Sequence, residues 1–174
     1  LIGAELNNID AILLRTKQDI ESPECKELMD TYQSLGYLLL ECSQHDVDSL
    51  EAVRDQLAGK TSLIIGASGV GKSSLVNALV PNAELRVGEI SKASGEGKHT
   101  TTSSRLFRLG DGAGVLIDSP GIRDFQPQML TSVELTNCFP EFRPHLGQCK
   151  FSNCEHTHEP ECAILKAISD GDIS

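Results

Sequence analysis

The segment Gly66-Ala67-Ser68-Gly69-Val70-Gly71-Lys72-Ser73 fits the pattern G-x-x-x-x-G-K-[ST]. An apolar stretch at 62–65 predicts a strand directly before it, and residues 74–80 predict a helix directly after it. In this setting the glycines let backbone N–H groups converge on phosphate oxygens, and the helix N-terminus adds partial positive charge. Lys72 is expected to reach the β and γ phosphates, and Ser73 to bind Mg²⁺. The predicted phosphate-binding residues are Gly66, Ala67, Ser68, Gly69, Val70, Gly71, Lys72, Ser73 and Ser74.

The chain on both sides of this loop alternates between strand and helix patterns. Apolar runs bounded by turn residues predict the strands, and amphipathic segments between them predict the helices. This alternation favours an α/β fold in which helices pack on a parallel sheet. The expected strands are 11–14, 37–42 and 62–65, with a hairpin of 103–109 and 114–117, and the expected helices are 23–35, 46 or 48 up to Gly59, 74–80 and 163–168.

A second phosphate motif follows the hairpin, where the predicted strand ends in Asp118-Ser119-Pro120-Gly121, a D-x-x-G pattern. Asp118 suits a role in holding Mg²⁺ through water, and the N–H of Gly121 suits the γ-phosphate. Between the two motifs lies an expected long loop, 82–100, which leads into Thr100, Thr101 and Thr102. A hydroxyl here can close on Mg²⁺ and release it after hydrolysis. We predict Thr101 in this role, with Thr100 as an alternative.

A base-recognition motif precedes the phosphate loop in the chain. Thr16-Lys17-Gln18-Asp19 follows a predicted strand and resembles N-K-x-D, in which the Asp carboxylate accepts hydrogen bonds from guanine. Adenine offers no such pair of donors, so Lys17 and Asp19 predict guanine specificity. Thr16 stands where the pattern has Asn, which removes one polar contact worth about 1 kcal/mol. Ser43, at the end of the next strand, is the predicted second base contact.

The order of these motifs is base reader, phosphate loop, switch threonines and D-x-x-G, which is a circularly permuted GTPase order. With Lys98-His99-Thr100-Thr101-Thr102 and a Cys/His-rich tail, the sequence resembles the RsgA (YjeQ) family. The resemblance implies a permuted GTPase domain at 1–130 and a small, α-rich zinc-binding domain at 131–174. It also implies an N-terminal OB-fold domain, which we expect to be absent from this chain. The abrupt start at Leu1 is typical of a fragment.

The family resemblance also implies a reaction and a catalytic residue. Members hydrolyse GTP to GDP and phosphate in late maturation of the 30S ribosomal subunit, and the ribosome stimulates them. Ile122 occupies the position of the glutamine that orients water in Ras-like enzymes, and isoleucine cannot do this. The resemblance makes His99 the candidate instead. The predicted catalytic residues are His99, Lys72 and Thr101.

Four metal-type ligands gather within the tail as Cys149-x₄-Cys154-x-His156-x₅-Cys162. Three thiolates and one imidazole can complete a closed tetrahedral zinc site, which is structural. His158 is equally suitable on chemistry alone, whereas the family resemblance implies His156. Cys138 falls outside the pattern and is predicted to be a small core residue. Zinc would replace the hydrophobic core that so short a tail cannot build.

Composition limits the remaining possibilities. The 174 residues carry 15 Lys and Arg against 25 Asp and Glu, a net charge of −10, so contact with 16S rRNA must be local. No apolar run is long enough to cross a membrane, and we predict a cytoplasmic monomer. Two rival interpretations remain open. One is a nucleotide-gated ribosome- or RNA-binding module with negligible hydrolysis, and the other is a P-loop ATPase with a coincidental T-K-x-D.

Overall fold

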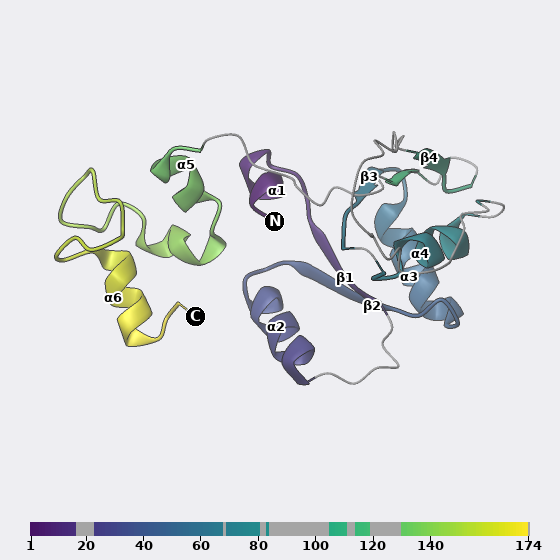
Figure 1. Cartoon of the computed structure of the whole chain (residues 1–174), viewed down its shortest axis with the longest axis horizontal. Helices are drawn as coiled ribbons and strands as arrows, with labels where there is room; N and C mark the ends of the chain where they lie inside the picture. Colours follow the sequence, from purple (N-terminus) through teal and green to yellow (C-terminus); the bar gives the residue numbers. More distant parts are fainter. Residues whose placement is uncertain are drawn as a thin grey trace, which may run out of the picture. The chain divides into compact units, whose positions relative to one another are not determined.

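The computed structural model describes residues 1–16, 23–67, 69–80, 83, 105–110, 114–118 and 130–173. The chain divides into two compact units. The sheet unit comprises Leu13–Glu27 and Leu39–Phe125, and the cysteine-rich unit comprises Leu1–Ile12, Leu28–Leu38 and Gln126–Ser174. This division groups two N-terminal segments with the C-terminal segment, whereas the sequence predicts a single boundary near residue 130. Figure 1 colours the chain by sequence position and labels most of the helices and strands.

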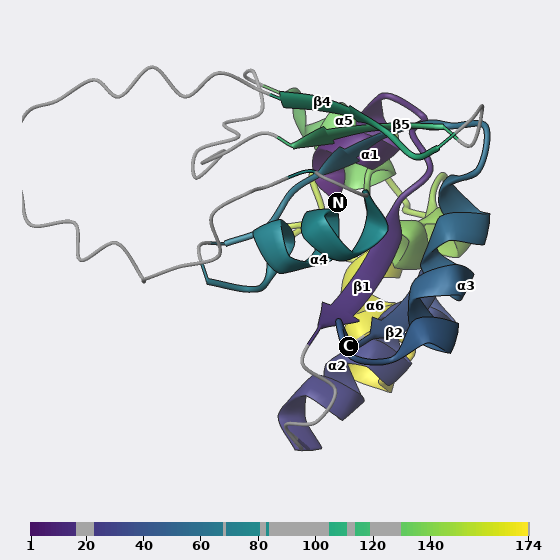
Figure 2. The ribbon, with the colours of Figure 1, turned by 90° about the vertical axis from the view of Figure 1, so that its right-hand side faces the viewer.

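Three strands of the sheet unit form one small sheet in the order β3-β5-β4. β3 and β5 run parallel with Ile64 opposite Asp118, and β4 pairs with β5 in antiparallel fashion with Arg105 opposite Asp118. Figure 2 shows β4 and β5 side by side. The predicted hairpin is therefore confirmed, but the sheet is mixed rather than purely parallel. The strands are β3 (Thr61–Ile64), β4 (Arg105–Arg108) and β5 (Val115–Asp118), while β1 (Ile12–Thr16) and β2 (Leu38–Cys42) form a separate two-stranded sheet.

Two helices supply the apolar faces of the sheet unit. α3 (Val47–Leu57) begins where the Asp46 carboxylate accepts a hydrogen bond from the Asp48 N–H at 3.2 Å. α4 (Lys72–Leu79) packs against it, and Arg54 of α3 donates to the Ala78 carbonyl of α4 at 2.7 Å. Leu116 of the central strand is completely buried beneath them. The buried core consists of Cys42, Leu50, Val53, Leu75, Val76, Leu79, Val80, Leu109 and Leu116.

One glycine joins the sheet to the end of α3. Gly114 has φ +122°, in the left-handed region, and a Cβ there would lie 2.5 Å from the Leu57 carbonyl oxygen and 2.9 Å from that of Lys60. The next residue, Val115, donates its N–H to the Lys60 carbonyl at 2.8 Å. Backbone therefore packs directly on backbone at this corner, which admits only glycine.

The cysteine-rich unit is built from short helices and loops. Its core is small, and α6 provides Ile164 and Ala167 to it. α5 is not among the sequence predictions, although Thr131 and Glu134 form a complete capping box at its start, a signal readable from S/T-x-x-E. The elements are α1 (Ile2–Leu6), the end of α2 (Pro23–Ser34), α5 (Ser132–Asn137), the 3₁₀ helix η1 (Pro140–His145) and α6 (Ala163–Asp170).

A polar contact ties α1 to η1 within this unit. Glu5 of α1 accepts a hydrogen bond from the Tyr37 hydroxyl at 2.7 Å and forms an ion pair with Arg143 of η1. The Tyr37 hydrogen bond lowers the pKa of the Glu5 carboxyl, burial opposes it, and Arg143 lowers it further. The contacts in this unit therefore stabilise the ionised form of the Glu5 carboxyl. Among the described residues, no helix is long and apolar enough to cross a membrane.

Candidate functional site

The predicted phosphate loop lies between β3 and α4, as the sequence requires. Gly69 and Gly71 adopt φ +81° and +103°, values in the left-handed region that turn the chain into the helix. The first helical hydrogen bond runs from the Leu75 N–H to the Gly71 carbonyl at 2.9 Å. The N–H groups of Lys72, Ser73 and Ser74 consequently have no helical acceptor. This helix start can therefore hold an anion.

Lys72 folds back over its own loop. Its ammonium donates to the carbonyls of Gly66 at 2.6 Å and Ala67 at 2.7 Å. An ammonium has three donors, so one remains for a further acceptor. The Lys72 ammonium therefore lies against the loop that precedes the open helix start, and Ser73, half-buried, follows Lys72 in the first turn of α4. Of the predicted phosphate contacts that the structure describes, Gly66, Ala67, Gly69, Val70 and Gly71 lie in the loop, and Lys72, Ser73 and Ser74 begin α4.

Thr16 connects the end of β1 to the phosphate loop. Its hydroxyl donates to the Val70 carbonyl at 2.5 Å. Its side chain also packs on Gly71, where a Cβ would lie 3.6 Å from Oγ1 and 3.7 Å from Cβ of Thr16. From its place in the T-K-x-D segment, Thr16 is predicted only as a weakened base contact. The structure instead engages its hydroxyl with the loop, a role that local sequence does not reveal because the two segments are 54 residues apart.

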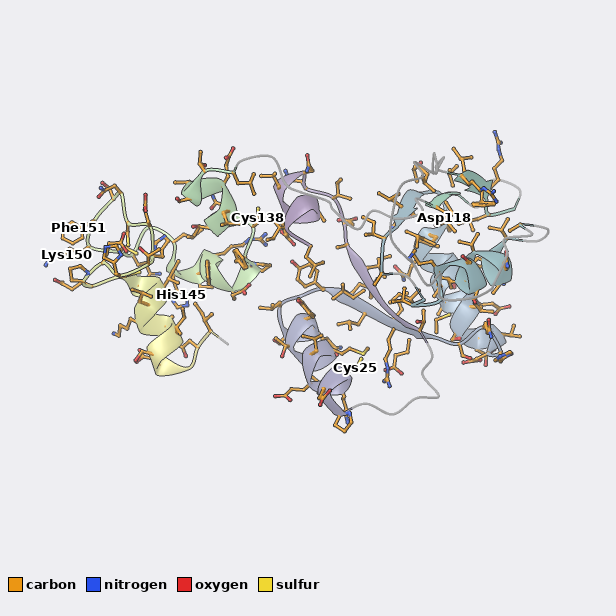
Figure 3. All side chains as sticks on the ribbon, in the orientation of Figure 1. Cys25, Asp118, Cys138, His145, Lys150 and Phe151 are labelled. Carbon is orange, nitrogen blue, oxygen red and sulfur yellow. The ribbon has the colours of Figure 1, made fainter. Side chains whose placement is uncertain are left out.

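Asp118 lies at the end of the sheet where the parallel strands β3 and β5 both finish. It is the last residue of β5 and lies opposite Ile64, the last residue of β3, after which the phosphate loop begins. Asp118 is 7% exposed and is the buried charged residue of the described chain. Figure 3 labels this side chain in the sheet unit. Because β3 and β5 are parallel and in register, Asp118 and the start of the phosphate loop lie at the same end of the sheet, as the two motifs predict.

Ser43 lies directly after β2 and is half-buried in the turn that begins α3. Its N–H donates to the Ser49 hydroxyl at 3.2 Å, its hydroxyl accepts from the His45 N–H at 3.3 Å, and its carbonyl accepts from the Asp46 N–H at 3.1 Å. These contacts hold the turn in one shape. Several predicted site residues lie outside the described residues: Lys17, Asp19, Ser68, His99, Thr100, Thr101 and Gly121.

The four predicted zinc ligands converge in the cysteine-rich unit. The ligand atoms of Cys149, Cys154, His156 and Cys162 all lie within 4.8 Å of one another. Nδ1 of His156 is 3.5 Å from Sγ of Cys149 and 3.4 Å from Sγ of Cys162, and these two sulfurs are 3.9 Å apart. Zinc at tetrahedral bond lengths would separate such atoms by about 3.5 Å (S···N) and about 3.8 Å (S···S). The ligand set and its spacing therefore fit Zn²⁺.

Backbone groups help to prepare these sulfurs. Cys149 Sγ accepts from the Ala163 N–H and Cys162 Sγ from the Leu165 N–H, each at 3.4 Å, at the start of α6. Burial opposes ionisation of Cys149, but the Ala163 N–H and the neighbouring thiols outweigh it and lower the pKa of Cys149. Thiolate is the form that binds metal. The helix start therefore favours the ligand form of Cys149, whereas burial raises the pKa of Cys154 to about 11.

Two other candidate residues lie apart from this cluster. His158 is exposed, and its Nδ1 contacts the Thr157 hydroxyl at 2.8 Å. Of the two histidines, His156 is the one that lies in the cluster with the three cysteines. Cys138 is 5% exposed and its thiol donates to the Glu134 carbonyl at 3.2 Å, which confirms it as a core residue. Figure 3 shows Cys138 away from the loop that carries Lys150 and Phe151.

A glycine-rich loop between a parallel strand and a helix, with an aspartate ending the neighbouring strand, defines a P-loop protein of the α/β class. The sequence profile of the RsgA GTPase family matches residues 1–128. The chain belongs to this family. It is 48% identical over 178 residues to the small ribosomal subunit biogenesis GTPase RsgA of Burkholderia mallei strain SAVP1, covering 100% of this chain and 56% of that protein. The RsgA of Pseudomonas fluorescens Pf-5 is 46% identical over 177 residues, covering 99% and 51%.

Solved structures show the same fold. YjeQ from Thermotoga maritima matches with a TM-score of 0.78 and 32% identity, covering 99% of this chain and 58% of that one. YloQ, described as a circularly permuted GTPase, matches with a TM-score of 0.71 and 30% identity, covering 99% and 54%. The chain thus spans about half the length of the relatives it matches. Its fold is that of circularly permuted GTPases.

Proposed function

We propose that this chain binds GTP and hydrolyses it to GDP and phosphate in late maturation of the 30S ribosomal subunit. The observation that carries the proposal is the phosphate loop, with Lys72 over an open helix start and Asp118 at the same sheet edge. Membership of the RsgA GTPase family supports the choice of nucleotide and of biological process. The relatives named above are ribosomal subunit biogenesis GTPases.

Separate groups of residues would bind the phosphates, the guanine base and Mg²⁺. Loop N–H groups and Lys72 bind phosphate oxygens, and Lys17 with Asp19 read guanine. Ser73 and Thr101 offer hydroxyls to Mg²⁺, and Asp118 holds it through water, because oxygen donors are those that Mg²⁺ prefers. Mg²⁺, when bound, neutralises charge on the phosphates. The proposed nucleotide contacts are Lys17, Asp19, Ser43, Gly66, Ala67, Ser68, Gly69, Val70, Gly71, Lys72, Ser73, Ser74, Asp118 and Gly121. Thr16 contributes to the nucleotide site through its hydrogen bond to the Val70 carbonyl.

Hydrolysis needs a residue that positions the attacking water. Ile122 has no polar atom with which to do so, and the family resemblance assigns the role to His99. Lys72 stabilises charge on the phosphates, and the Thr101 hydroxyl closes on Mg²⁺ before hydrolysis and releases it afterwards. A site without the usual glutamine is expected to turn over slowly until a partner completes it, in keeping with stimulation by the ribosome.

The proposed domain layout is a permuted GTPase domain at 1–130 followed by a zinc-binding domain at 131–174. The family profile ends at residue 128, which supports this boundary. Cys149, Cys154, His156 and Cys162 would hold one Zn²⁺ in a closed, structural site. We propose that the protein is cytoplasmic and monomeric. Its net charge of −10 limits contact with 16S rRNA to local patches.

Nucleotide competition tests the base reader. GDP, GTP and ATP compete for the chain in Mg²⁺, with wild type, Asp19→Ala and the control Asp55→Ala, which removes an exposed carboxylate on α3. Guanine nucleotides should win on wild type and on the control, and lose their advantage on Asp19→Ala. Equal competition by ATP on wild type would contradict guanine recognition.

Single-turnover hydrolysis tests the enzyme itself. The rate of GTP cleavage is measured with and without small ribosomal subunits, for wild type and for His99→Ala. We expect subunits to accelerate wild type and to have much less effect on His99→Ala. Absence of acceleration on intact protein would favour a nucleotide-gated binding module over a GTPase.

A further inference from the structure

The segment that carries the histidine ligand is conformationally unusual. Between the second and last cysteine ligands, His156 has φ +60° and Glu161 has φ +58°, both in the left-handed region although neither is glycine. Such residues persist only where surrounding contacts hold them. The segment is exposed over most of its length and has a hydrophobic core only beneath its cysteines. Some polar contact must therefore fix its shape.

Around Glu161, the Lys150 N–H donates to the Glu161 carbonyl at 3.3 Å. Around His156, Glu159 supplies the polar contacts. One carboxylate oxygen accepts from the Glu155 N–H at 2.8 Å. The other accepts from the N–H of Thr157 at 3.0 Å and of His158 at 3.1 Å. A single side chain thus satisfies three backbone donors, which lie on both sides of His156 in sequence. Charge-assisted bonds of this kind are about twice as strong as neutral ones.

The shape of this turn determines which histidine faces the cysteine sulfurs. With its neighbouring peptides held, the His156 imidazole presents Nδ1 to the sulfurs of Cys149 and Cys162. The same contacts leave His158 outside, paired with Thr157. Both imidazoles are chemically able to bind zinc and are only two residues apart. The backbone conformation between them therefore decides which one becomes the ligand.

We propose that Glu159 is the positioning residue of the metal site: it holds the 155–158 turn so that His156, and not His158, completes the ligand set. This inference rests on the proposed zinc site. Glu159 is not itself one of the clustered ligands, which are Cys149, Cys154, His156 and Cys162; its two oxygens accept from backbone N–H groups. Its effect passes through the orientation of His156.

The test measures metal affinity of the full chain rather than hydrolysis. Zn²⁺ is titrated in competition with a chromophoric chelator, for wild type, Glu159→Gln and Glu159→Ala. Glutamine keeps one accepting oxygen and alanine keeps none, so affinity should fall in the order wild type, Gln, Ala. Loss of a residue that orients a metal ligand typically costs about 10–100-fold in affinity, which is the expected size for Glu159→Ala.

A matched control separates position from charge. Glu155→Gln removes the same charge from the same turn, yet its carboxylate makes no hydrogen bond or ion pair with the described residues. Its backbone N–H, which Glu159 binds, is unchanged. Glu155→Gln should therefore bind zinc about as tightly as wild type. An equal loss in both variants would show that charge alone is responsible and would overturn the proposal.

Cobalt substitution reports the ligand set directly. With Glu159 intact, the Co²⁺ spectrum should lose its imidazole contribution in His156→Ala and keep it in His158→Ala. In the Glu159→Ala background, His158→Ala should change the spectrum, because the histidines then compete. An unchanged spectrum there, or zinc affinity of Glu159→Ala equal to wild type, would refute the positioning role while leaving the zinc site intact. A wild-type chain that binds neither metal would overturn both.

Discussion

The contact between Thr16 and the phosphate loop makes a prediction that separates two roles for one residue. Thr16→Val keeps the shape that packs on Gly71 and removes the hydroxyl that donates to the Val70 carbonyl at 2.5 Å. Val70 is partly exposed, so water can replace the lost donor. The net loss should then be about 1 kcal/mol, which is about fivefold in affinity.

The assay is titration of a fluorescent GDP analogue, with GDP and ADP as competitors. If Thr16 holds the loop, Thr16→Val weakens both nucleotides by the same factor and leaves their ratio unchanged. Thr16→Ser, which keeps the hydroxyl, should retain most of the affinity. Thr136→Val is the matched control, because it removes a similar hydroxyl-to-carbonyl bond of 2.7 Å in α5, far along the chain from the loop.

Two results would refute this reasoning. Unchanged affinity for GDP would mean that the hydroxyl does not support the loop. A selective loss of GDP over ADP would mean that Thr16 contacts the base, as its place in T-K-x-D predicts from sequence. Thermal unfolding of the same variants shows whether any loss reflects global destabilisation instead.

Four further outcomes follow from other contacts. Gly114→Ala should destabilise the sheet unit by about 3 kcal/mol, seen as a fall in the unfolding midpoint of about 10 °C, because its Cβ would collide with the Leu57 carbonyl at 2.5 Å. An unshifted midpoint would contradict that packing. Lys72→Ala should weaken GTP binding about 10–100-fold through loss of charge-assisted bonds, measured by calorimetry. Chelation of zinc should reduce helical circular dichroism and expose the cysteine thiols to a thiol reagent, while GDP affinity stays constant. Glu5, whose pKa is lowered, stabilises the fold above its unfolded value of about 4.3 and loses that contribution as pH falls through the lower folded value, so Glu5→Gln should make stability in urea less dependent on pH below about 4.

The local elements follow closely from the sequence. Pro23 begins α2, Asp46 caps α3, and Gly36 and Gly59 adopt positive φ after α2 and α3, as their positions predict. These features depend on neighbours a few residues away, which the sequence displays directly. α5 could have been found in the same way from Thr131 and Glu134. The arrangement of strands in two sheets could not, because pairing depends on segments far apart in the chain.

The same distinction between local and long-range contacts applies to the phosphate loop and to the Cys/His cluster. By itself, the sequence determined the phosphate loop and the Cys₃His ligand set, because each is a contiguous motif whose glycines, lysine and thiols act over a short span. Only the tertiary structure decided that Asp118 shares an edge with the loop, that Thr16 binds the loop carbonyl, and that His156 rather than His158 faces the sulfurs. Each of these depends on strand register or on backbone conformation. Both are set by contacts, such as that of Glu159 with three N–H groups, that residue type and spacing do not reveal.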